Sequence, residues 1–310
     1  MRQDSFERWF GVVYLSVPLS WAGSFIAARF VVAEIDPLRS VIWRFALSAL
    51  VLLPFLVAFR RRQHPDLTRA DYLRHLAVVV GLAGIGYHLL FFWALTRASP
   101  TNAALIIGLN PFFTAVAEVV ILRRVRPRRF YVGFGLALAG AAAVILLRGG
   151  AIARPGLGEL LCLLAALTWS TYAVAAGATR TEAWDPLWTN AYSYLLTALL
   201  LLPFAGIWRG QALGAGLTAK GWLGCVYMGV FPTAIGYTLF YVAVQRRGPG
   251  WASAFTCLVP PLTALLDHLF FAARLTPAML GGTALVVLGL VVGTWTGRWP
   301  PSRRKEQPEP

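Results

Sequence analysis

The most distinctive chemical group in this sequence is an arginine, Arg44, that lies within an otherwise apolar stretch, residues 40–59. An arginine deep in a membrane-spanning helix costs about 2.5–3.5 kcal/mol on insertion scales, so such a residue often has a functional role. A guanidinium can hold a carboxylate through two parallel hydrogen bonds. Arg44 is therefore predicted to anchor a substrate carboxylate. The alternatives are extension of the side chain to the membrane interface, or pairing with a helix-end carbonyl.

A second group of candidate residues consists of aromatic and polar side chains in the middle of apolar stretches. Trp21 and Trp169 could stack on a planar or apolar substrate, or could simply pack in the core. His88 could bind substrate, relay a proton, or be satisfied by a neighbouring helix. Asn110 could satisfy a free carbonyl or offer its amide to substrate. The predicted substrate-binding residues are Arg44, Trp21, Tyr87, His88, Asn110, Trp169, Tyr172, Tyr192, Tyr237 and Tyr241.

Three ionisable residues near the ends of apolar stretches are candidates for carrying a coupling proton. Glu118 is followed closely by Arg123 and Arg124, so an ion pair at the membrane interface explains it equally. Asp267 and His268 are adjacent, which brings two titratable groups to one place near the end of a later stretch.

The residues that would indicate an enzyme or a cofactor are missing from the sequence. It has four histidines, and none belongs to a His-Glu-x-x-His motif; a Walker motif is likewise absent. The three cysteines, Cys162, Cys225 and Cys257, have neither the spacing of a metal site nor that of a disulfide framework. We therefore expect no cofactor, no metal and no direct use of ATP, and an intramembrane enzyme is the weaker alternative.

The elements that position these side chains are predicted to be membrane-spanning helices. Of the 310 residues, 58% are hydrophobic and only 13% are charged, against about 25% charged in soluble proteins. A spanning helix needs about 20 apolar residues, and in lipid its backbone groups must be paired internally. Ten runs free of Asp, Glu, Lys and Arg meet or approach this length: 9–28, 45–59, 76–96, 98–117, 130–147, 160–179, 186–208, 221–245, 248–266 and 275–297. The second run is short alone and reaches spanning length when residues 40–44, which include Arg44, are added.

The distribution of basic residues predicts how these helices are oriented. The net charge is +15, from 28 Lys and Arg against 13 Asp and Glu. Most of the basic residues fall in segments on the same side as the N-terminus. The positive-inside rule then places both termini in the cytoplasm of a cell whose inner (plasma) membrane holds the protein. The charge is expected to meet anionic lipid headgroups, and no nucleic-acid partner is predicted.

The two halves of the sequence resemble each other at an offset of roughly 150 residues. Leu-Leu-Pro-Phe at 52–55 recurs at 201–204, and Ile-Gly-Tyr at 85–87 recurs at 235–237. Because each half holds five helices, an odd number, the second half must enter the membrane from the opposite side. The predicted fold is an all-α integral membrane protein of ten transmembrane helices in two inverted repeats. The boundaries are 9–148 for the first repeat, 156–297 for the second and 298–310 for a disordered cytoplasmic tail.

Prolines and glycines indicate where this fold could move and where it could associate. Proline inside a helix removes a backbone donor and favours a kink. The predicted gating hinges are Pro18, Pro111, Pro232, Pro260 and Pro261. The fifth and tenth helices are rich in glycine and lack ionisable residues, so they are predicted to pack at the periphery, where they could form a dimer contact. Monomer and homodimer both remain open.

These features resemble the drug/metabolite transporter superfamily, in its EamA family. The resembling residues are Trp21, the run Arg44 to Leu47, Asn110 to Ala115 and Pro260 to Ala264, and the resemblance covers about residues 10–297. The family often ends its fourth and ninth helices with Gly-Glu-Arg. This chain instead reads Leu-Arg-Arg at 122–124 and Ala-Ala-Arg at 272–274, without the acidic partner.

The resemblance implies a secondary transporter that exports small metabolites by alternating access. Amino acids, including aromatic ones, are known substrate classes of the family and fit an arginine surrounded by aromatic residues. The alternative is a multidrug-type efflux protein, which the aromatic residues also suit, although an acidic residue central in the bundle is missing.

Overall fold

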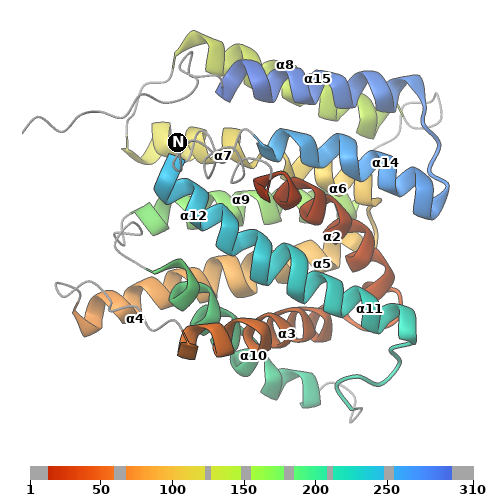
Figure 1. Cartoon of the computed structure of the whole chain (residues 1–310). Coiled ribbons are helices and arrows are strands. Elements are labelled where there is room, and N and C mark those ends of the chain that lie inside the picture. The colour runs from red at the N-terminus through yellow and green to blue at the C-terminus, as the bar shows by residue number, and fades with distance from the viewer. Residues whose placement is uncertain are drawn as a thin grey trace, which may run out of the picture.

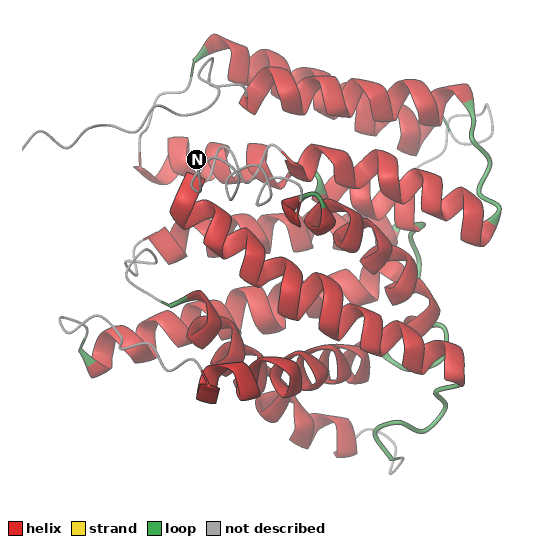
Figure 2. Cartoon of the chain, in the orientation of Figure 1, coloured by secondary structure: helices red, strands yellow, loops and turns green. Residues whose placement is uncertain are grey.

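The structure, a computed structural model, describes residues 13–58, 68–122, 127–147, 155–177, 185–207, 212–247 and 255–294, which form helices joined by short loops (Figures 1 and 2). Seven stretches in this part are long and apolar enough to cross a membrane, and three further apolar helices are shorter. The predicted all-α membrane class is therefore confirmed, whereas the count of ten spans stays a prediction. The predicted tail, 298–310, lies outside the described residues.

The helices run back and forth across the bundle. In the first repeat they are α2 (Ser16–Val32), α3 (Pro37–Ala58), α4 (Arg69–Val78), η1 (Val79–Tyr87), α5 (His88–Leu95), α6 (Pro100–Ile107), α7 (Asn110–Leu122) and α8 (Arg128–Leu146). In the second they are α9 (Leu157–Gly177), α10 (Pro186–Ile207), α11 (Ala219–Met228), η4 (Gly229–Tyr237), α12 (Thr238–Arg247), η5 (Phe255–Leu258), α14 (Val259–Phe271) and α15 (Pro277–Thr294). We call the end of the bundle where α2 begins the near end, and the opposite end the far end (left and right in Figure 1).

The fifth helices of the two repeats, α8 and α15, pack against each other along one edge of the bundle (Figure 1). A Cβ atom on Gly140 would lie 2.5 Å from the carbonyl oxygen of Gly282, and one on Gly289 would lie 2.5 Å from that of Gly133. Residue numbers thus rise along one helix as they fall along the other, so the two helices are antiparallel. This is the relation expected of inverted repeats. These glycines serve contact between α8 and α15, and the dimer contact stays a prediction.

The third and eighth spans each contain a π-helical segment of nine residues that the sequence did not reveal. These segments are η1 and η4, and each end of η4 lies 150 residues after the matching end of η1. A π turn shifts backbone hydrogen bonding by one residue and is often found at functional sites. In each case a polar side chain reaches a carbonyl five residues earlier. His88 Nδ1 lies 2.6 Å from the Ala83 oxygen, and the Thr233 hydroxyl donates to the Met228 oxygen at 2.6 Å.

The fourth and ninth spans are interrupted at equivalent places. The turn at residues 108–109 separates α6 from α7, and the short 3₁₀ helix η5 precedes α14. The two interruptions touch, because a Cβ atom on Gly108 would lie 3.0 Å from Pro260 Cγ. Discontinuous helices of this kind expose backbone to a binding site in many transporters.

The five predicted hinge prolines do not share one structural setting. Pro18 lies in the first turn of α2, Pro111 in that of α7, and Pro260 and Pro261 in that of α14, where a missing N–H costs no helical hydrogen bond. Pro232 lies in the middle of η4. Movement at these positions stays a prediction.

Candidate functional site

A cavity of about 130 Å³ lies between the two repeats. It is bordered by the interruptions of the fourth and ninth spans and by the ends of both π segments, whereas α8 and α15 contribute none of its described lining. The lining residues are Trp21, Ser24, Phe25, Arg44, Tyr87, Phe91, Ala104, Ile107, Gly108, Asn110, Pro111, Trp169, Tyr237, Phe240, Thr256 and Val259. Seven of the predicted residues, Trp21, Arg44, Tyr87, Asn110, Pro111, Trp169 and Tyr237, are thus brought together here.

Arg44 brings a positive charge to this cavity from the middle of α3. Its side chain is only 3% exposed; Nε donates to Thr233 Oγ1 at 2.8 Å, and Nη1 donates to Ser24 Oγ at 3.2 Å. The guanidinium also lies 5.8 Å from the ring centre of Phe91. All these partners are neutral. Among the described residues the one ion pair joins other groups at the far end, so no described carboxylate balances Arg44. A buried cation with only neutral partners attracts an anion.

The walls of the cavity are aromatic and come in pairs from the two repeats. Trp21 lies 5.3 Å from Tyr237, and Tyr87 lies 5.0 Å from Trp169, measured between ring centres. Trp169 and Tyr237 stack at 5.8 Å. The Trp21 indole is held in place because Nε1 donates to the Pro232 carbonyl at 3.1 Å. Such walls can stack on a planar or apolar group, and their faces can also receive a cation.

Asn110 adds a hydrogen-bond acceptor to the same cavity. Its Oδ1 atom is buried and has no hydrogen-bond partner among the described residues, while its backbone oxygen accepts from Ser170 Oγ at 3.5 Å. A buried acceptor without a donor costs about 1–3 kcal/mol. A ligand that brings an N–H donor to Asn110 would remove this cost.

The remaining predicted binding residues lie outside the described lining. His88 is buried behind the wall, with its ring centre 4.7 Å from that of Phe45. Its Nδ1 faces a carbonyl, which can only accept, and its Nε2 has no partner among the described residues. Tyr172 packs against Trp169, one of the lining residues, with ring centres 5.2 Å apart. Tyr192 is 37% exposed on α10, and Tyr241 lies on α12 beyond the described lining.

The predicted coupling residues do not meet at the cavity. Asp267 is buried at the far end, where Oδ2 accepts from the Thr101 amide at 3.1 Å and from its hydroxyl at 2.6 Å. His268 is exposed beside it, with Nδ1 2.8 Å from the Ala273 oxygen. The side chain of Glu118 lies outside the described part.

At the far end, three carboxylates accept hydrogen bonds from residues of the other repeat. Of these three residues, the sequence analysis singled out only Asp267. Glu34, just after α2, accepts from the Thr218 amide at 2.9 Å and its hydroxyl at 2.7 Å, at the start of α11. Glu159 of α9 accepts from Asn102 Nδ2 of α6 at 2.9 Å. The two threonine contacts place a carboxylate at a helix N-terminus, where the macrodipole favours negative charge. We call the contacts of Glu34, Glu159 and Asp267 the far-end clamps.

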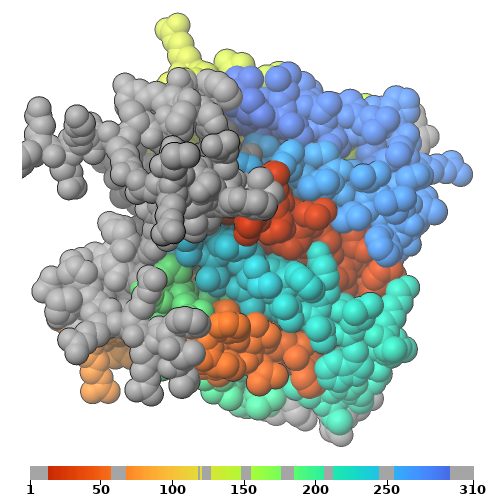
Figure 3. Space-filling view, viewed as in Figure 1, coloured from red at the N-terminus to blue at the C-terminus, as the bar shows by residue number. Residues whose placement is uncertain are grey.

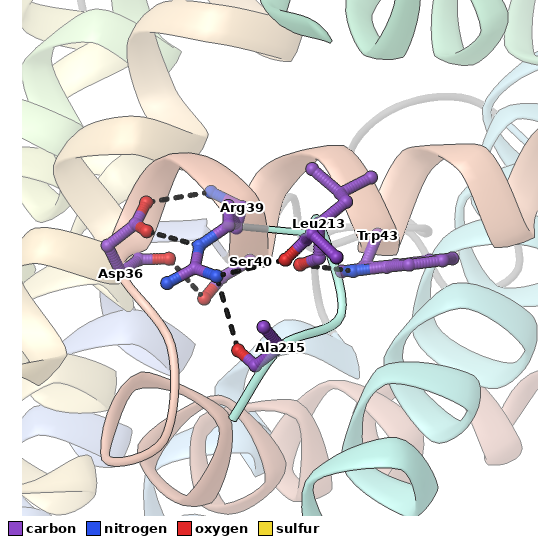
Figure 4. A network of polar contacts seen from close by, with 7 residues as sticks. Asp36, Arg39, Ser40, Trp43, Leu213 and Ala215 are labelled. Carbon is purple, nitrogen blue, oxygen red and sulfur yellow. Dashed lines mark hydrogen bonds and ion pairs between the residues drawn. The ribbon is translucent and has the colours of Figure 1, made fainter. Parts of the chain in front are cut away.

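A second set of contacts attaches residues 212–218, here called the strap, to the start of α3 (Figure 4). Arg39 is paired with Asp36 at 2.5 Å, and its Nη1 donates to two strap carbonyls at 3.4 and 3.2 Å. Trp43 Nε1 donates to a third at 3.1 Å. The α11 helix that follows the strap lies directly against α2 and α3 (Figure 3). The repeats are thus joined at the far end by polar contacts.

Comparison with known proteins agrees with this architecture. Residues 9–146 and 156–295 each match the EamA-like transporter family. The uncharacterized transporter YyaM of Bacillus subtilis (strain 168) is 28% identical over 304 residues, which cover 96% of this chain and 97% of that protein. The WAT1-related protein At4g08290 of Arabidopsis thaliana is 24% identical over 295 residues, covering 82% and 74%. A solved crystal structure has the same fold, with a TM-score of 0.68 at 20% identity over 91% of this chain and 95% of that one. This chain is a multi-pass membrane transporter and belongs to the EamA-like transporter family of the drug/metabolite transporter superfamily.

Proposed function

We propose that this transporter exports small metabolites that carry a carboxylate, and that amino acids are its substrates. The observation that carries the proposal is Arg44, a buried guanidinium that lines the cavity and has only neutral partners among the described residues. A substrate carboxylate would supply the missing negative charge and accept two parallel hydrogen bonds from the fork.

The other lining groups favour an amino acid over a simple carboxylate. Asn110 Oδ1 is a buried acceptor without a donor among the described residues, and the α-ammonium group of an amino acid could donate to it. The aromatic walls around Trp21 and Trp169 suit a planar or apolar side chain, so aromatic amino acids are included among the proposed substrates.

We place the near end in the cytoplasm, because most basic residues of the sequence fall on that side. The far end would then face the outside of the inner (plasma) membrane. In the proposed cycle the substrate reaches the cavity from the near end while the far-end clamps are closed. The clamps then open as the repeats rock against each other, as in alternating access between inverted repeats.

The test of the proposal is uptake of labelled amino acids into proteoliposomes, measured with and without an imposed pH gradient. We expect saturable uptake of at least one amino acid, with aromatic ones among the best, because the cavity offers a cation, an acceptor and aromatic walls. A pH-dependent rate would indicate proton coupling. If no amino acid is transported while aromatic drugs are, the proposal is wrong and the multidrug alternative is favoured.

A further inference from the structure

The guanidinium of Arg44 is held from the opposite repeat by one hydroxyl group. Thr233 lies in η4 and is fully buried, and its Oγ1 accepts from Arg44 Nε at 2.8 Å. The same hydroxyl donates to the Met228 carbonyl at 2.6 Å. A threonine hydroxyl carries one proton, so a proton given to the carbonyl leaves only acceptor capacity for the arginine. The lone pairs of the hydroxyl are therefore turned toward Arg44, which has donors only.

Pro232 bars the α-helical hydrogen bond that would compete with the π register around Thr233. In a regular α-helix the Met228 carbonyl would accept from the amide of residue 232, four positions later. Proline has no amide hydrogen, so that bond cannot form. In the π register the backbone partner of this carbonyl is residue 233, and the Thr233 hydroxyl donates to the same oxygen.

Two further bonds hold the part of η4 that precedes Thr233 against the first repeat. Trp21 Nε1 donates to the Pro232 carbonyl at 3.1 Å, and Ser48 Oγ of α3 donates to the Gly229 carbonyl at 2.8 Å. Close packing supports them, because a Cβ atom on Gly229 would lie 2.7 Å from that of Leu47.

The π segment of the first repeat, η1, lacks this arrangement. The positions that correspond to Pro232 and Thr233 in η1, 150 residues earlier, are Leu82 and Ala83, which can neither remove an amide hydrogen nor offer a hydroxyl. The two repeats differ in the same way at the cavity itself, because the arginine in the described lining, Arg44, belongs to the first repeat.

We propose that Thr233 is a positioning residue that presents the Arg44 guanidinium to the substrate carboxylate, and that Pro232 favours the π register that places its hydroxyl there. The proposal rests on the proposed function, since it assigns the group that orients the substrate anchor. It also links substrate binding to the second repeat, because the anchor of one repeat is aimed by the π segment of the other.

The experiment measures KM and Vmax of L-phenylalanine uptake in proteoliposomes for Thr233→Val and Thr233→Ser. The valine variant keeps the shape but removes the acceptor, and we expect KM to rise about tenfold with Vmax within about twofold of the parent, the size typical of a hydrogen bond to a charged group. The serine variant keeps the hydroxyl and should restore the parent KM. Thr233→Ala serves as a second hydroxyl-free variant if valine prevents insertion.

Two further variants separate positioning from general packing. Thr263→Val is the matched control, because Thr263 is also a fully buried threonine, lies on α14 outside the described lining, and has a hydroxyl without a described partner. It should leave KM unchanged. Pro232→Ala restores the amide hydrogen that the α-helical register requires, and a shift to that register would turn Thr233 away from Arg44, so KM should rise by a few-fold.

The outcomes distinguish this proposal from the one on which it rests. Parent protein that transports L-phenylalanine, with an unchanged KM in both hydroxyl-free variants, would contradict the role of Thr233 alone. A fall in Vmax without a rise in KM would show a merely structural role and overturn it as well. Parent protein that transports none of the amino acids contradicts the proposed function and this inference together.

Discussion

Replacing Arg44 by glutamine is expected to lower Vmax/KM for uptake of L-phenylalanine into proteoliposomes by about 100-fold or more. The variant loses both the charge and the fork that can bind a carboxylate. Two hydrogen bonds to a charged group contribute about 3 kcal/mol or more together, which corresponds to at least that factor. Arg44→Lys keeps the charge without the planar fork, so an intermediate loss is expected.

The loss should arise at the substrate site, with the fold retained. Arg44 is 3% exposed and its described partners are neutral, so glutamine removes a charge whose burial costs about 2.5–3.5 kcal/mol on insertion scales. This gain offsets the lost bonds to Ser24 and Thr233, and the melting temperature in detergent should be unchanged or higher.

The matched control is Arg29→Gln. Arg29 also lies within a membrane helix, but its guanidinium donates to the Leu95 carbonyl and does not line the cavity. The control should retain most of the parent activity. Substantial uptake by Arg44→Gln, or an equal loss in both variants, would show that Arg44 has no special role in binding.

Weakening the far-end clamps should open the cavity from the far end. Asp267→Asn combined with Glu34→Gln replaces two carboxylates that each accept the amide and the hydroxyl of a threonine in the other repeat. Bonds to a charged acceptor contribute about 1.5–3 kcal/mol. The far-end-open state should therefore become at least about tenfold more populated, since about 1.4 kcal/mol corresponds to a factor of ten.

A single reporter cysteine measures this opening. In a variant with Cys162, Cys225 and Cys257 replaced by alanine, cysteine is introduced at Ala104, which lines the cavity and is fully buried. A membrane-impermeant maleimide is applied from the far side of oriented vesicles. We expect labelling to be at least about tenfold faster when the clamps are weakened.

Asp71→Asn is the control for this experiment. Asp71 also accepts the amide and the hydroxyl of a threonine, at 2.9 and 2.7 Å, but that threonine, Thr68, is the N-cap of its own helix at the near end. The same chemical change is thus made without crossing the repeats, and labelling of the reporter should stay at the parent rate. Equal labelling of all three proteins would show that the clamps do not gate the far end.

The sequence predicted the architecture well because the information is local. Long apolar runs, the recurrence of Ile-Gly-Tyr and the depth of Arg44 can all be read without knowing the neighbouring helices. The repeat also pairs Tyr87 with Tyr237 through Ile-Gly-Tyr, and both tyrosines line the cavity.

The rest of the site depends on contacts that the sequence does not reveal. Thr233 meets Arg44 from 189 residues away, and Asp267 meets Thr101 from 166 residues away. Hydropathy gives the depth of a residue but not its face, because a helix that is apolar all round has no distinct side. His88 therefore seemed equivalent to Tyr87, although it lies behind the wall that the tyrosine forms.

The central claim is that the cavity binds a carboxylate through Arg44, and a matched pair of competitors tests it most directly. L-Phenylalanine and L-phenylalaninamide share the ring and the α-amino group and differ only in the carboxylate. Each is added unlabelled to the parent protein during uptake of a labelled amino acid that it transports. We predict that the acid inhibits uptake at least about 100-fold more strongly than the amide, which cannot form the charged pair. Equal inhibition by the two compounds would contradict the claim.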